Sequence, residues 1–178
     1  MKSRVALVLI GAWLTGTVCV SVVATQNFYT VDRMLTDRAN ATFSATADNL
    51  GQPRTRDLLR FLSSELNRLY FRLWNVVQLM IGGVTLWLVW EPKTNARWLV
   101  AAMFASTVVV AALTPEIVSL GRSLDFVARD PAPPGMSRFW MLHAAYTSLE
   151  MIKLTIGFVA AILLVREPAG REGFRAPT

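Results

Sequence analysis

Four long apolar segments divide this chain: Val5–Ala24, Tyr70–Trp90, Trp98–Leu120 and Phe139–Val165. Each has about 20 residues or more, which is enough for a helix to cross a hydrocarbon layer of about 30 Å. Lipid offers no hydrogen-bond partner to a backbone amide, so each segment must be a helix. The pattern predicts an all-α integral membrane four-helix bundle, built as a single membrane domain over residues 1–178.

The long connection Thr25–Leu69 also carries a helical pattern. Apolar residues at helical spacing predict that the first helix projects beyond its span: Phe28, Val31 and Leu35. Gly and Pro within Asn49–Pro53 predict a break. Leucines then alternate with charged residues over Arg56–Leu69, which predicts an amphipathic helix that either lies in the membrane interface, packs on a partner or caps the bundle. Asn40-Ala41-Thr42 has the form of a glycosylation sequon.

The shorter connections indicate how the chain is oriented. Basic residues flank the two termini and the connection Glu91–Arg97, and such an excess is typical of the cytoplasmic side. We therefore expect cytoplasmic termini, an extracytoplasmic loop 25–69 and placement in a bacterial inner membrane. The proline-rich Asp130–Gly135 predicts a stiff turn between the third and fourth spans.

Composition narrows the possible functions. Hydrophobic residues make up 53% of the chain and charged residues 17%, well below the quarter expected of a soluble domain. The net charge of +6 sits near the ends of the spans, which favours contact with lipid headgroups over nucleic acid binding. The first segment has a longer apolar core than a cleaved signal peptide, and we expect it to be retained. Cys19 is the single cysteine, so no disulfide forms within the chain.

The fourth apolar segment carries the most informative polar residues. His143, Tyr146, Glu150 and Lys153 follow one another at i, i+3, i+7 and i+10, which places them in one stripe along a helix. Ionisable groups at bilayer depth normally face protein or water and have a partner. Glu150 is spaced to pair with Lys153, and Tyr146 to donate to Glu150.

Other polar residues are expected at a similar depth in the extracytoplasmic half of the bundle. Span direction places Glu116 near His143. It places Arg72 near the mouth of the second span, with Asn75 and Gln78 about one to two turns further in. The candidate intramembrane polar site therefore has eight members: His143, Tyr146, Glu150, Lys153, Glu116, Arg72, Asn75 and Gln78. Three readings stay open, namely a self-neutralising Glu150–Lys153 pair, a polar cavity, and a contact between subunits.

Cofactor and catalytic motifs are not found in the sequence. A single histidine and the lack of a Cys-x-x-Cys-His motif speak against haem, and methionine in apolar helices is usually a gap filler rather than a copper ligand. Gly-rich phosphate loops, serine elbows and zinc spacings are also missing. We therefore expect neither a cofactor nor a catalytic site.

Short motifs in the spans resemble the bacterial DUF4149 and TMEM205-like family of four-span membrane proteins. They are Gly11-Ala12-Trp13, Tyr70-Phe71, Leu113-Thr114-Pro115 and Phe139-Trp140-Met141-Leu142-His143. The resemblance implies the four-span architecture. The family pattern His-x-x-Ser-x-x-x-Asn in the fourth span corresponds here to His143, Tyr146 and Glu150, and a family asparagine in the third span corresponds to Val109.

Two functions follow from the sequence. The first is a small membrane protein whose polar cluster binds or passes a small solute, an ion or a proton. The second is an accessory subunit of a larger membrane complex or a homo-oligomer, suggested by the small size and by the amphipathic segment Arg56–Leu69. Beyond the lipid bilayer, the sequence identifies no partner.

Overall fold

The computed structural model describes residues 2–90 and 96–166 as an assembly of five helices. They are α1 (Lys2–Asp37), α2 (Ala41–Leu50), α3 (Gln52–Trp90), α4 (Arg97–Ser123) and α5 (Met136–Arg166). All but α2 are long and apolar enough to cross a membrane. The prediction of an all-α helical bundle is confirmed, and the chain is an integral membrane protein.

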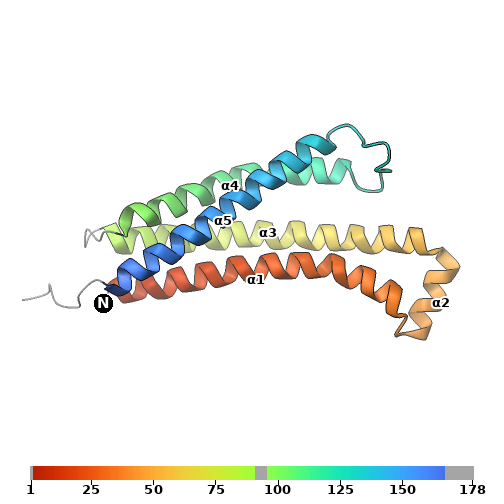
Figure 1. Ribbon diagram of the computed structural model, residues 1–178, viewed down its shortest axis with the longest axis horizontal. Coiled ribbons are helices and arrows are strands. Elements are labelled where there is room, and N and C mark those ends of the chain that lie inside the picture. The colour runs from red at the N-terminus through yellow and green to blue at the C-terminus, as the bar shows by residue number, and fades with distance from the viewer. Residues whose placement is uncertain (1, 91–95, 167–178) are drawn as a thin grey trace, which may run out of the picture.

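Helices α1 and α3 form a long antiparallel hairpin (Figure 1). At 1.5 Å per residue the 36 residues of α1 reach about 54 Å, nearly twice the hydrocarbon thickness. The predicted extension of the first helix is therefore confirmed, and the amphipathic Arg56–Leu69 is a continuous part of α3. Polar contacts hold the two extensions together: the Asn27 amide donates to Asn67 at 2.7 Å, and Asn67 donates to the Ala24 carbonyl at 2.9 Å.

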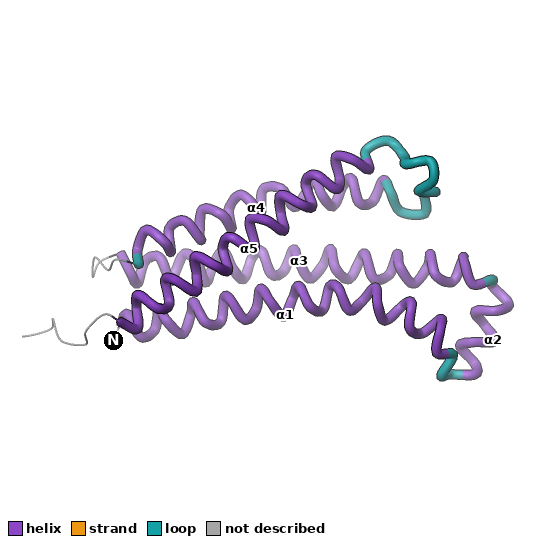
Figure 2. Tube along the Cα trace, viewed as in Figure 1, coloured by secondary structure: helices purple, strands orange, loops and turns teal. Residues whose placement is uncertain are grey.

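Helix α2 closes the far end of this hairpin (Figure 2). It begins after Asn40, whose side-chain oxygen accepts from the Phe43 amide at 2.9 Å, as a helix N-cap does. It ends at Gly51, where a φ of 89° favours glycine. The predicted break at Asn49–Pro53 is thus confirmed, whereas the short helix α2 was not foreseen.

Helices α4 and α5 form the second pair. The connection between them, residues 124–135, contacts α3. The ring of Phe126 in this connection lies 5.1 Å from the ring of Phe61 on α3. Helix α4 continues through Pro115 rather than ending there. The predicted connection Glu91–Arg97 and the tail after Arg166 lie largely or wholly outside the described residues.

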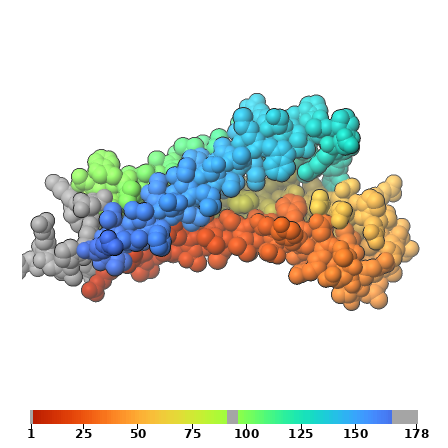
Figure 3. All heavy atoms as spheres, viewed as in Figure 1, coloured from red at the N-terminus to blue at the C-terminus, as the bar shows by residue number. Residues whose placement is uncertain are grey.

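The pairs α1–α3 and α4–α5 meet most closely at the end of the bundle where the chain starts, which we call the termini end. The core there consists of buried apolar residues from all four long helices, among them Ile10, Val89, Val100 and Ala160. Towards α2, α5 diverges from α1, while near the termini end the two lie directly against each other (Figures 1 and 3). The two ends of the bundle therefore differ: one is packed with apolar side chains, and the other spreads apart.

Candidate functional site

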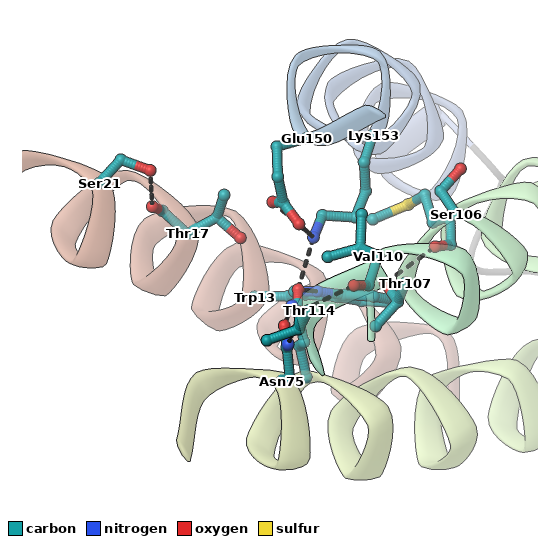
Figure 4. Close-up of polar contacts among 12 residues, drawn as sticks. Trp13, Thr17, Ser21, Asn75, Ser106, Thr107, Val110, Thr114, Glu150 and Lys153 are labelled. Carbon is teal, nitrogen blue, oxygen red and sulfur yellow. Dashed lines mark hydrogen bonds and ion pairs between the residues drawn. The ribbon is translucent and has the colours of Figure 1, made fainter. Parts of the chain in front are cut away.

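A network of polar side chains crosses the middle of the bundle. Lys153 on α5 donates to Oε1 of Glu150 at 2.7 Å and to Oε1 of Gln78 on α3 at 2.5 Å. The same oxygen of Gln78 accepts from the indole of Trp13 on α1 at 3.2 Å. Three of the long helices thus meet at one amide oxygen (Figure 4).

The network continues from Gln78 to the fourth long helix. The Gln78 amide donates to Asn75 at 2.9 Å, and Asn75 donates to the hydroxyl of Thr114 on α4 at 2.7 Å. Thr114 donates in turn to the carbonyl of Val110, one turn earlier in α4, at 2.8 Å. We call Trp13, Gln78, Asn75, Thr114, Glu150 and Lys153 the central network.

The charged pair of the central network is almost fully withdrawn from the surface. The Lys153 side chain is 1% exposed and that of Glu150 is 10% exposed. The Lys153 ammonium also lies 5.9 Å from the centre of the Trp13 ring, a favourable cation–π position. Because the charges lie together and Lys153 also donates to Gln78, the pair avoids the large penalty of an isolated charge at bilayer depth.

The central network lies near the midpoint of the spans. Lys153 is 14 residues from Phe139 and 12 from Val165, the two ends of the fourth apolar segment. Gln78 and Trp13 lie similarly near the middle of the second and first segments. Glu150 and Lys153 thus lie close to mid-depth of the fourth apolar segment, and the placement of the polar cluster in the extracytoplasmic half stays a prediction.

Three buried polar atoms near this level have no hydrogen bond among the described residues. They are Oε2 of Glu150, the hydroxyl of Thr17 on α1 and the indole nitrogen of Trp74 on α3. Glu150 Oε2 lies 2.7 Å from the Lys153 ammonium, so it has an ion-pair partner even though no aligned hydrogen bond reaches it. Buried polar groups without partners are rare and destabilising, so the Thr17 hydroxyl and the Trp74 indole mark a place where the bundle is not optimised for stability alone.

The packing around the network is tight. The ring of Trp13 lies over Gly82, where an added Cβ would come within 2.7 Å of it, and Trp74 covers Gly16, where a Cβ would lie 2.1 Å from the ring. Two hollows on the surface of the described residues lie away from the network, one beside α2 and one between α3 and the end of α4. The central network is thus a closed set of bonded side chains.

The structure divides the eight predicted site residues into two groups. Asn75, Gln78, Glu150 and Lys153 belong to the central network, and the predicted Glu150–Lys153 pair is confirmed. The other four lie outside it: His143, Tyr146, Glu116 and Arg72.

Each of these four has its own surroundings. His143 is exposed and stacks 5.8 Å from Phe139 on its own helix, at a level where α5 has diverged from α1. Tyr146 is half-buried with its ring edge against Phe71 at 5.7 Å, and the described residues contain no hydrogen bond from it to Glu150, contrary to the prediction.

Glu116 and Arg72 face outwards. Glu116 forms an ion pair with Arg138 on the surface between α4 and α5. Arg72 is exposed and lines the groove between α3 and the end of α4. The depth predicted for these residues stays a prediction, and the rotation of their helices directs them away from the bundle axis.

Two members of the central network were missed. Trp13 lies in the middle of its span, whereas tryptophan in membrane helices usually gathers at the interfaces, and this unusual depth was an available signal. Thr114 precedes Pro115, and its hydroxyl bonds within α4 as well as accepting from Asn75. Its role depends on the rotation of α4, which the sequence does not reveal.

The site defines a class of protein rather than a particular one: a four-span membrane bundle with a buried ion pair at its centre. Comparison of the chain with protein-family models, with curated proteins and with solved structures gives no match. The resemblance to the DUF4149 and TMEM205-like family stays a prediction. Among the described residues, no group of three or more histidine, cysteine, aspartate or glutamate side chains is arranged to hold a metal ion.

Proposed function

We propose that this membrane protein reversibly binds a proton at the Glu150 carboxylate, from the α2 side of the bundle. The supporting observation is a carboxylate buried at the centre of the bundle, with both of its oxygens beside the Lys153 ammonium. Of the ligands suggested by the sequence, a proton is the one that needs no cavity, which suits the close packing around the central network. Solute transport has less support for the same reason.

The surroundings of Lys153 fit such a protonation. When the proton adds to Glu150 Oε2, the carboxylate becomes a neutral acid and the network gains one positive charge. Lys153 would then keep its contacts with Gln78 at 2.5 Å and with the Trp13 ring. These groups stabilise an ammonium whose counter-ion has been neutralised, because an amide oxygen and an aromatic face both attract a cation.

The route to the carboxylate is one-sided in this proposal. Towards α2, the half-buried Tyr146 and the exposed His143 lie one and two turns before Glu150 on α5. Towards the termini end, the apolar core around Ile10, Val89 and Ala160 separates the network from the other face. In this proposal, protons therefore reach Glu150 from the α2 side and leave again towards the same side.

Infrared difference spectroscopy of the protein in lipid nanodiscs tests this proposal. Acidification is expected to produce the carbonyl band of a protonated carboxyl that is present in the wild type and in Glu116→Gln, a matched variant at a surface carboxylate, and absent in Glu150→Gln. Circular dichroism checks that each variant keeps its helices. An identical set of bands in the wild type and Glu150→Gln refutes the proposal.

The orientation of the protein is a second part of the proposal. Lys2, Arg4 and Arg166 cluster at the termini end, which supports a cytoplasmic termini end in a bacterial inner membrane. In a Cys19→Ser background, a single cysteine introduced at exposed Thr42 should react with an impermeant thiol reagent in intact cells. Reaction only after lysis would show that the termini end faces the extracytoplasmic side instead.

A role as an accessory subunit is the second candidate. The α1–α3 hairpin extends beyond α4 and α5 and carries exposed apolar residues between arginines, such as Tyr29, Leu58 and Leu62. Extraction in mild detergent followed by size analysis tests this role. Stable co-migration with another chain supports it, and a free monomer or homodimer opposes it.

A further inference from the structure

A groove between α3 and the end of α4 contains an unusual set of charges. It has a volume of about 330 Å³ and is open to the surroundings. Its walls combine three arginines, one glutamate and three leucines: Arg68, Arg72, Arg122, Glu65, Leu62, Leu66 and Leu69. The groove lies where α3 enters its apolar segment at Tyr70, which is the level of the membrane interface.

The three arginines differ in how closely carboxylates compensate their positive charges. Arg68 is only 10% exposed and contacts Glu65 at 2.5 Å and Asp125 at 2.9 Å. Arg122 is half-exposed and reaches Glu65 at a longer 3.3 Å. Arg72 is exposed and has no ion-pair partner among the described residues. Three guanidinium groups thus face two carboxylates, which leaves one positive charge, located at Arg72.

An apolar track leads from this charge into the membrane. Leu69, Leu73, Val76 and Met80 follow the same outward face of α3 at spacings of three and four residues, and each is about half exposed. From Arg72 to Met80 the helix rises about 12 Å, close to the half-thickness of about 15 Å that one acyl chain occupies. The charge and the track are thus adjacent and in the order of a lipid headgroup and its chain.

We infer that this groove is a binding site for one anionic phospholipid, whose phosphodiester contacts Arg72 and Arg122 and whose acyl chain lies along Leu73, Val76 and Met80. A phosphodiester carries a single negative charge, which matches the single uncompensated positive charge of the groove. Guanidinium groups bind phosphate oxygens through two parallel hydrogen bonds, and no other side chain of residues 2–90 and 96–166 forms an ion pair with Arg72. The inference is independent of proton binding at Glu150.

The test uses full-length protein, delipidated in neutral detergent and titrated with phosphatidylglycerol by native mass spectrometry. Arg72→Gln is expected to weaken binding of the first lipid about fivefold, the effect of one basic residue near an anionic lipid. Arg33→Gln is the matched control, because Arg33 is an exposed arginine on α1 outside the groove. It should leave the first binding event unchanged, and Arg72→Lys should recover only part of the affinity.

Further arms identify the source of the phosphate. Phosphatidylcholine, which has the same phosphodiester but no net charge, should bind more weakly than phosphatidylglycerol, and soluble glycerophosphate should compete poorly because it lacks the chain. Equal losses of affinity for the first lipid in Arg72→Gln and Arg33→Gln would overturn the site, because they would indicate a general attraction between basic residues and anionic lipid. Equal binding of the two lipids, or full competition by glycerophosphate, would overturn the assignment to an anionic phospholipid.

Discussion

The ammonium of Lys153 and the side-chain oxygen of Gln78 lie 2.5 Å apart and join α5 to α3 in the centre of the bundle. The same oxygen accepts from Trp13, so one amide serves two donors from two other helices. This arrangement makes Gln78 the junction of α1, α3 and α5, and it places a charged pair where the surrounding spans are apolar.

Replacing Lys153 alone should destabilise the bundle more than replacing both charges. Lys153→Met leaves the Glu150 carboxylate buried without its counter-ion, a change that costs about 3–5 kcal/mol in buried ion pairs. The double variant Lys153→Met with Glu150→Leu removes both charges and should recover much of this loss. Chemical unfolding in detergent, arranged as a double-mutant cycle, measures the coupling. Additive effects of the two substitutions would contradict a direct pair.

Removing the Gln78 amide should weaken the contacts among three helices at once. Gln78→Leu leaves Trp13 Nε1 without an acceptor and Lys153 with Glu150 alone, and unsatisfied buried donors cost about 1–3 kcal/mol. Trp13→Phe removes the donor and part of a fully buried ring but leaves Lys153 with both of its acceptors, so its effect should come mainly from lost packing. The free energy of unfolding of both variants provides the comparison. A Gln78→Leu protein as stable as the wild type would show that the amide is dispensable.

Two adjacent glycines on α3 offer a matched test of the packing. A Cβ at Gly82 would lie 2.7 Å from both Phe104 and Trp13, while Gly83 has nothing within 4 Å. Gly82→Ala should destabilise by about 1–3 kcal/mol through overpacking. Gly83→Ala should be neutral or stabilising by up to about 1 kcal/mol, because alanine favours helix. Thermal unfolding of the two variants should move in opposite directions, and similar shifts would contradict the packing at Trp13.

Acid should weaken the contact between α3 and the end of α4. Hydrogen bonds from Arg122, and then from Arg68, hold the pKa of Glu65 below its usual value near 4.5. Because the folded pKa is depressed, the stabilising effect is complete above about pH 4.5 and is lost as the pH falls through the folded value.

Arg122→Gln removes the largest cause of this shift and supplies the comparison. The unfolding temperature of the wild type should fall more steeply in acid than that of Arg122→Gln. Parallel pH profiles would show that Glu65 makes no contribution through Arg122.

The sequence revealed the parts of the structure that depend on local pattern. Span lengths follow from apolar runs, and the Glu150–Lys153 pair follows from i, i+3 spacing on one helix. The rotation of each helix about its axis could not be predicted from the sequence, because a span that is apolar on all sides has no face that marks the core. That is why Trp13 was missed and why Glu116, which pairs with Arg138, was wrongly grouped with the interior.

Helix α2 shows a different limit. Asn40 stood out as part of a sequon, yet in the structure its side chain caps a helix of ten residues. Such a short segment has too few turns for a clear periodic pattern, so its capping residue was the stronger signal. Longer elements of the same chain, such as α3, were recognised because their pattern repeats over many turns.

The apolar core at the termini end has an electrical consequence for the proposed proton site. A proton that travels from the α2 side to Glu150 and stops there crosses about half of the transmembrane voltage drop. A full crossing is worth about 2.3 kcal/mol per 100 mV, so half amounts to about 1.2 kcal/mol, or about a sevenfold change in proton affinity. The occupancy of Glu150 would then report membrane polarisation as well as acidity, with no current passing through the protein.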